Sequence, residues 1–130
     1  MIQDRKIIEF NQGRAILEVD CYIKTGRLSI DAYLIDSDED FGSITIDLPY
    51  LFIKDYDEGF IDNIANSDLF DLIPKMKELG IIEKSYGIKK YNYGTYEYVK
   101  FNIEKLKEYD KEGVENYLSL SNKIEHNISI

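Results

Sequence analysis

Carboxylate side chains, the groups with the clearest capacity for chemistry in this sequence, are concentrated in one stretch. Residues 31–71 contain twelve Asp or Glu and only Lys54, whereas the segments on either side are close to neutral; the whole chain carries −9. Such a block repels nucleic acid and anionic membranes and attracts a basic protein surface or a cation. The acidic stretch is therefore the first place to look for a binding function.

A calcium loop is the most specific chemistry that this stretch suggests. Asp36, Asp38 and Asp40 have the spacing of the first ligands of an EF-hand loop. The glycine expected at the sixth position is replaced by Phe41, and the twelfth position is Asp47 instead of Glu. The pattern therefore favours a solvated acidic turn, and we assign no metal or other cofactor, although the loop's capacity to bind a cation stays open.

The second reading of the acidic stretch is a protein-binding surface. Spaced carboxylates can take the place of phosphates on a basic groove, and tyrosines beside charges are common at interfaces. This predicts a non-enzymatic inhibitor or adaptor that binds a host protein with a basic surface, such as a defence or nucleic-acid-handling protein. The alternative is that the charges only keep the chain soluble. The candidate residues are Asp31, Tyr33, Asp36, Asp38, Glu39, Asp40, Asp47, Asp55, Asp57 and Glu58.

Tyrosine and lysine alternate in a later segment, residues 84–100, which contains four Lys, five Tyr and a single acid, Glu97. Aromatic rings interleaved with cations can stack on bases and pair with phosphates, so an accessory protein for single-stranded nucleic acid is an alternative function. Tyrosine is also a common strand residue, and the net charge of −9 disfavours direct nucleic-acid binding by the chain as a whole.

Nucleophilic and phosphate-binding motifs are missing from the sequence. His126 is the only histidine, and the single cysteine, Cys21, falls on a predicted core face. No glycine-rich phosphate loop occurs. We therefore expect no enzyme, while keeping a carboxylate-based enzyme or small-molecule binder as a third alternative. One cysteine, and the lack of a signal-like or membrane-length apolar run, favour a cytoplasmic location.

Period-two alternation predicts strands in the first half of the chain. Alternate apolar residues run through 15–23, 28–34 and 44–48, with a turn at Thr25-Gly26 and a short strand at residues 6–10. Residues 50–66 have no clean period and are expected to form a packed connection. A homodimer through the other face of the sheet is conceivable, because Ile16, Tyr22, Tyr33 and Ile35 are expected to face outward.

Helical spacing and a second strand pair follow in the other half. Ser67 is expected to cap a helix near 68–79 that Pro74 kinks or breaks and that Gly80 ends. Strands at 81–86 and 95–101 precede a helix capped by Asn102. We predict one α+β domain, residues 1–120, in which an antiparallel sheet of five or six strands begins with a meander and packs against one or two helices; residues 121–130 are expected to be a frayed tail.

Three segments resemble a family of small bacterial proteins of unknown function that plasmids, conjugative elements and phages of Gram-positive bacteria carry. They are the hairpin and fourth strand (residues 26–30 and 44–49), the helix end (residues 76–81) and the strand-to-helix run from Tyr98 to Gly113, with Tyr117 beyond. Together they span roughly residues 15–120. The resemblance implies an accessory role on a mobile element, including interference with host defence as an anti-CRISPR protein does, and it transfers no catalytic residues.

Overall fold

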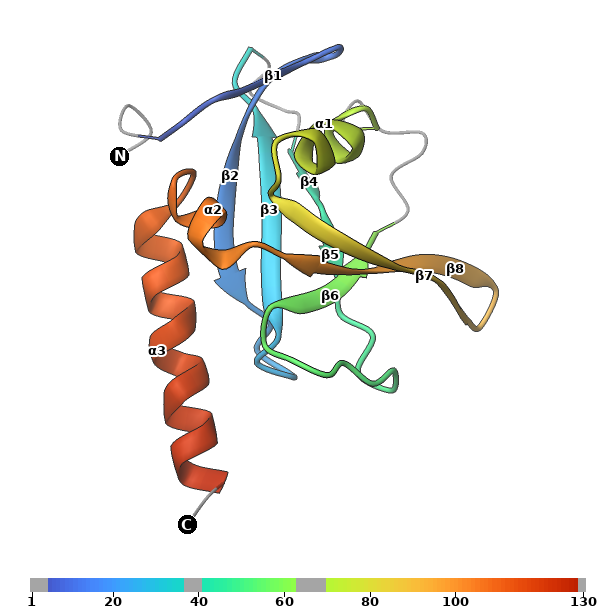
Figure 1. Cartoon of the computed structure of the whole chain (residues 1–130), viewed down its shortest axis with the longest axis vertical. Coiled ribbons are helices and arrows are strands. Elements are labelled where there is room, and N and C mark those ends of the chain that lie inside the picture. Colours follow the sequence, from blue (N-terminus) through green and yellow to red (C-terminus); the bar gives the residue numbers. More distant parts are fainter. Residues whose placement is uncertain (1–4, 37–40, 63–69, 129–130) are drawn as a thin grey trace.

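The computed structural model describes residues 5–36, 41–62 and 70–128 and has an α+β fold of antiparallel strands and three helices (Figure 1). The predicted fold class is thus confirmed. The strands do not form one sheet of five or six strands, however, but two four-stranded sheets whose strands run steeply across one another in Figure 1. The predicted cap Ser67 lies outside the described residues.

The first sheet, sheet A, is the predicted meander. Its strands follow the chain order β1 (Ile8–Phe10), β2 (Gly13–Cys21), β3 (Leu28–Leu34) and β4 (Phe41–Ser43). Alternate residues of β2 and β3, such as Leu17 and Ile30, are fully buried in the core, as period-two alternation predicts. Ile16 was expected to face outward but is only 4% exposed, so it does not offer a free apolar surface for a dimer. Tyr33 lies directly opposite it.

The second sheet, sheet B, has the order β5-β6-β8-β7, with β5 (Thr45–Ile46), β6 (Glu58–Ile61), β7 (Ile82–Tyr91) and β8 (Gly94–Phe101). β6 falls within the stretch expected to be a connection without a strand, and that expectation is wrong. The strand escapes pattern recognition because all four of its residues are buried, which removes the alternation. β7 and β8 turn tightly at Asn92 and Tyr93, where Asn92 has a φ of 54°.

Ile44 joins the two sheets. Its N–H donates to Ile30 of sheet A (2.8 Å), and its carbonyl accepts from the N–H of Asp62 beyond β6 (2.9 Å). The next residue, Thr45, is 1% exposed, and its Oγ1 accepts the N–H of Ile30 (3.0 Å) while it hydrogen-bonds Tyr22 (2.8 Å). The predicted fourth strand therefore bends at Ile44. The residues before the bend pair with sheet A, and those after it pair with the second sheet.

The first helix, α1 (Leu72–Glu78), is shorter than predicted. Pro74 lies in its first turn, where a backbone N–H has no intrahelical acceptor, so the proline produces no kink and that prediction is wrong. The predicted ending at Gly80 is correct. This glycine has a φ of +80° and donates to Lys77, while the N–H of Ile81 donates to Met76, which is the Schellman pattern.

The last two helices are α2 (Ile103–Lys107), capped by the Asn102 side chain as predicted, and α3 (Lys111–Ile128). Asp110 connects them to sheet A. It is 4% exposed, and its carboxylate accepts the N–H of Gly113 in α3 (3.1 Å) and the N–H of Val19 in β2 (2.8 Å). Val19 lies on the part of β2 that the short β1 leaves unpaired. Asp110 thus caps a helix and covers a sheet edge with one side chain.

The main core lies between the sheets and receives Leu72 and Met76 from α1, Leu106 from α2 and Val114 and Tyr117 from α3. α3 runs alongside β2 (Figure 1). Within the described residues, none of the helices has the combination of length and apolar character needed to cross a membrane.

Candidate functional site

A group of acidic side chains lies on the outer face of sheet A. Glu18 on β2 is directly opposite Asp31 on β3, and Asp20 is two residues further along β2 on the same face. We call these three side chains, which are exposed or half-buried, the acidic face. In the part of the chain that the structure describes, no Lys or Arg forms an ion pair with any of the three.

The electrostatics of the acidic face are visible at Asp31. Partial burial raises the pKa of its carboxyl, and the charges of Glu18 and Asp20 raise it further, against the lowering effect of a hydrogen bond with Ser43. Tyr33 lies on the same strand and hydrogen-bonds Glu18, and burial together with the Glu18 and Asp31 charges raises its pKa. Like charges directly opposite each other destabilise a sheet. The fold therefore holds these carboxylates together against their repulsion.

Other candidate carboxylates from the acidic stretch bind side chains of the protein itself. Asp36 forms a two-pronged ion pair with Arg14, whose Nη2 and Nε lie 2.7 and 3.2 Å from its carboxylate oxygens, and this hydrogen bonding lowers the pKa of Asp36. Asp47 accepts a hydrogen bond from Thr25 (2.9 Å) at the end of the β2–β3 hairpin. Unlike the three carboxylates of the acidic face, Asp36 is thus paired with a cation, and Asp47 is bound to a side chain of the hairpin. Asp38, Glu39 and Asp40 lie outside the described residues.

Glu58 is buried and hydrogen-bonded within the fold, so it is not available to a partner. It is 2% exposed, and its Oε1 accepts hydrogen bonds from the backbone N–H of Lys54 (2.8 Å), from the backbone N–H of Asp55 (3.1 Å) and from the Tyr98 hydroxyl. Burial alone would raise the pKa of Glu58, but these hydrogen bonds and one from Tyr86 lower it. Conversely, burial and the bond to Glu58 raise the pKa of Tyr98 to about 12.

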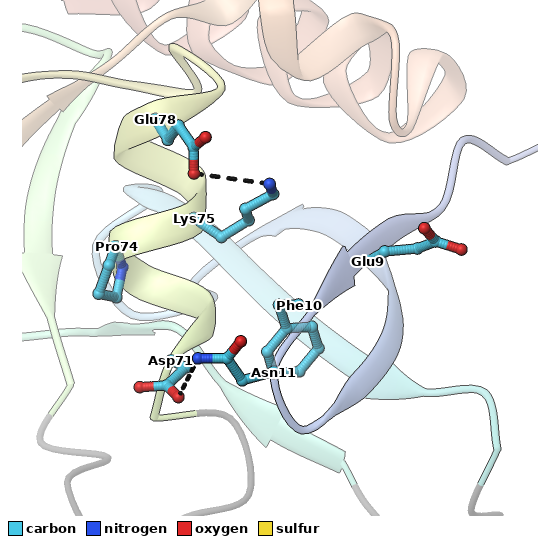
Figure 2. Close-up of a pocket in the computed structure, with 7 residues that line it drawn as sticks. All are labelled: Glu9, Phe10, Asn11, Asp71, Pro74, Lys75 and Glu78. Carbon is cyan, nitrogen blue, oxygen red and sulfur yellow. Dashed lines mark hydrogen bonds and ion pairs between the residues drawn. The ribbon is translucent and has the colours of Figure 1, made fainter.

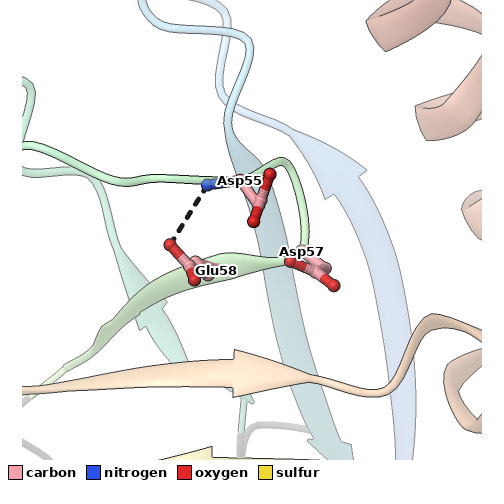
Figure 3. Close-up of side chains that lie close together, drawn as sticks. All are labelled: Asp55, Asp57 and Glu58. Carbon is pink, nitrogen blue, oxygen red and sulfur yellow. Dashed lines mark hydrogen bonds between the residues drawn. The ribbon is translucent and has the colours of Figure 1, made fainter. Parts of the chain in front are cut away.

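Asp55, Asp57 and Glu58 also lie close enough together to be tested as a cation site. One oxygen from each lies within 4.8 Å of the others, on the turn that leads into β6 (Figure 3). Burial raises the pKa of Asp57, whose Oδ1 is buried without a hydrogen-bond partner. Its other oxygen is 3.8 Å from Lys100, and Glu58 already accepts several hydrogen bonds. This arrangement is that of an anchored turn, and we assign no metal to it.

A cleft of about 440 Å³ between β1 and α1 includes none of the predicted site residues (Figure 2). Its polar groups bond one another. Asn11 (3.0 Å) and Gln12 (2.9 Å) both donate to Asp71, lowering the pKa of that carboxyl, and Lys75 pairs with Glu78 (3.5 Å). The cleft therefore offers a ligand few unsatisfied groups.

Glu18 and Asp20 are residues of the candidate site that were not predicted from the sequence. They lie outside the acidic stretch in sequence, and the strand pairing brings them beside Asp31. A partial signal was present, because the alternation places Glu18, Asp20 and Asp31 on one face. A two-residue turn at Thr25-Gly26 would, however, pair Asp20 with Asp31, whereas the observed register pairs Glu18 with Asp31.

Comparison with known proteins identifies a family and no individual relative. No curated protein and no solved structure matches the chain. A family model matches residues 16–120, a range that starts in β2, ends in α3 and includes the whole acidic face. Since this range covers most of the chain, the protein belongs to the DUF4313 family, a domain of unknown function.

Proposed function

We propose that this protein is a non-enzymatic binding protein whose acidic face docks onto a basic surface of a partner protein. The observation that supports the proposal most strongly is the placement of Glu18 opposite Asp31, with Asp20 beside them and no ion-paired Lys or Arg among the described residues. Such an arrangement disfavours folding of the isolated sheet, whereas a cationic partner would turn the repulsion into attraction.

Tyr33 fits the same role. Its ring shares the outer face with the three carboxylates, and its hydroxyl is held by Glu18. A tyrosine presented among charges supplies contact area with little loss of side-chain entropy on binding, which is why interfaces are enriched in this residue. In this proposal the carboxylates select and orient the partner, and Tyr33 contributes apolar contact.

The partner class follows from the chemistry of a basic protein surface. Proteins that handle nucleic acid carry lysine- and arginine-rich grooves for phosphates, and a set of carboxylates can occupy such a groove. For a chain that resembles proteins of mobile elements, the proposed role is an inhibitor or adaptor that blocks a host defence or nucleic-acid-handling protein. The blockade is steric and electrostatic and requires no bond-making step.

The test compares two variants with equal changes in charge. The face variant is Glu18→Gln, Asp20→Asn and Asp31→Asn; the control replaces three exposed acids elsewhere, Glu9, Glu104 and Glu115, by Gln. Each tagged protein is used to capture partners from a Gram-positive lysate, with quantitative mass spectrometry. We expect one or more basic proteins to bind the wild type and the control but not the face variant.

Purified partner and protein then give the salt dependence of the affinity by calorimetry. The proposal expects weaker binding as salt rises, because exposed charges more than a Debye length apart are screened. Equal capture by the face variant and the control, from preparations that both remain folded, would contradict the proposal and leave the charges with a role in solubility alone.

A further inference from the structure

The β7–β8 hairpin extends from the body of the protein as a two-stranded ribbon and reaches beyond the other strands in Figure 1. All residues from Glu83 to Lys90 on β7 are exposed, so both faces of that strand are open to solvent. Between Lys84 and Tyr96 the ribbon contains three lysines, four tyrosines and no acid. The charge of this ribbon is therefore opposite to that of the chain as a whole.

The two acids on the strands of the ribbon form ion pairs of their own, and Glu58, which lies beside the rings, is only 2% exposed. Glu97 forms an ion pair with Lys77 of α1 (2.9 Å), and Glu83 pairs with Lys100 (3.4 Å). Among the described residues, Lys84 and Lys89 form no ion pair with a carboxylate. Two cations on this face are thus available to a ligand.

Strand register places aromatic rings on the same face as these cations. Lys89 lies directly opposite Tyr96, and Tyr98 is on the same face two residues further along β8. Tyr86 packs beside Tyr98 with ring centroids 4.9 Å apart, and the Nζ of Lys84 lies 5.2 Å from the centre of the Tyr86 ring. The outer face of the ribbon therefore alternates between rings and ammonium groups.

Buried Glu58 holds the rings in position. It accepts hydrogen bonds from the hydroxyls of Tyr98 and Tyr86, and Phe60 stacks against the other side of this pair, 5.1 Å from the Tyr98 centroid. Tyr86 nevertheless remains 39% exposed. A partly exposed ring whose orientation is fixed in advance loses little entropy when a flat ligand stacks on it.

We propose that this face of the β7–β8 ribbon binds single-stranded nucleic acid, with Tyr86 stacking on a base and Lys84 and Lys89 pairing with phosphates. Base–aromatic stacking needs a solvent-accessible ring, and phosphate pairing needs a cation close to that ring. The ribbon supplies the 39% exposed Tyr86 ring with the Lys84 ammonium 5.2 Å from its centre, a mobile side chain that can turn toward a phosphate as the base stacks. The site is separate from the acidic face on sheet A, and neither proposal depends on the other.

The test is fluorescence polarisation of a labelled oligothymidine of about 12 nucleotides, a length within the range of common single-strand site sizes. At about 50 mM salt we expect the wild type to bind and affinity to fall as salt rises. Tyr86→Ala should weaken binding by about tenfold, whereas Tyr86→Phe, which keeps the ring, should bind nearly as the wild type does. Tyr50→Ala, at an 81% exposed tyrosine outside the ribbon, is the control and should have no effect.

A second experiment tests the charges with the double variant Lys84→Gln, Lys89→Gln. The matched control, outside the ribbon, is the double variant Lys107→Gln, Lys111→Gln. The ribbon pair should reduce the slope of log affinity against log salt by about 1.4, or about 0.7 per phosphate contact, and the control pair should not. An abasic oligonucleotide of equal length should bind more weakly. Three results would overturn the proposal: no binding at low salt, equal binding of the abasic strand, or displacement of the oligonucleotide by a polyglutamate peptide of equal charge as effectively as by oligothymidine.

Discussion

Replacing Asp31 by asparagine should stabilise the folded protein at pH 7, although most substitutions within a sheet destabilise it. Asp31 lies opposite Glu18 and near Asp20, and the substitution removes both repulsions. The new amide can be accommodated, because asparagine keeps the shape of the side chain and can both donate to and accept from the Ser43 hydroxyl.

The size of the gain follows from the strand pairing. A directly opposite pair of like charges costs about 0.2–1 kcal/mol relative to a neutral pair, and the diagonal Asp20 adds a smaller repulsion. We therefore expect Asp31→Asn to raise the free energy of unfolding by about 1 kcal/mol at pH 7. For a domain of this size the melting temperature should rise by about 4 °C.

Urea unfolding at pH 7 and at pH 3 is the assay, because the gain should depend on pH. The folded-state pKa of Asp31 is raised, so the folded state binds this proton more tightly than the unfolded state does. The wild type therefore has the full contribution below the unfolded pKa of about 4 and loses it as pH rises through the folded pKa. The difference in stability between the Asp31→Asn variant and the wild type should thus be small at pH 3 and develop above it.

A double-mutant cycle with Glu18→Gln assigns the effect to the pair. If the repulsion is the cause, the two single gains should not add, because either change alone removes the same interaction. A loss of stability for Asp31→Asn at pH 7 would refute the reasoning, as would a gain of equal size at pH 3. A loss would mean that the hydrogen bond between Asp31 and Ser43 outweighs the charge repulsion, and an equal gain at pH 3 would mean that the gain does not come from charge.

Two further predictions concern residues away from the acidic face. Asp110→Ala should lower the free energy of unfolding by about 3 kcal/mol in urea titrations, because it removes the cap on Gly113 and leaves the buried N–H of Val19 without an acceptor; an effect under about 1 kcal/mol would contradict this role. Tyr98 should titrate with a pKa of about 12 by phenolate absorbance. Since this pKa is raised in the folded state, its contribution is full below about pH 10 and is lost as pH rises through about 12; Tyr98→Phe should abolish that part of the alkaline loss of stability.

Local patterns in the sequence were sufficient to predict an element where its residue types favour one backbone conformation. The β2–β3 hairpin follows from alternation and a turn, and the end of α1 follows from the positive φ that Gly80 adopts. The start of α1 could not be predicted as well, because Ser67 and Asp71 are both acceptable caps and Pro74 is compatible with a helix only if that helix begins late.

Features that depend on long-range packing were not predictable. Glu58 looks like a solvated acid in the sequence, and only the folded chain brings Tyr98, forty residues away, to bury and satisfy it. The division into two sheets depends on the bend at Ile44, which no glycine or proline marks. For the candidate site, charge counted along the chain pointed to Asp31 but also to Asp36, whose charge Arg14 neutralises in the folded protein.

The bend at Ile44 has a consequence for how the molecule comes apart. One peptide segment hydrogen-bonds to sheet A through its N–H and to the chain beyond β6 through its carbonyl. Opening of either sheet therefore displaces the residue that also bonds the other sheet, so we expect the two halves to open together. The amides of Ile44 and Asp62 should exchange with deuterium only in global unfolding events, and the chain should melt as one cooperative unit despite its two sheets.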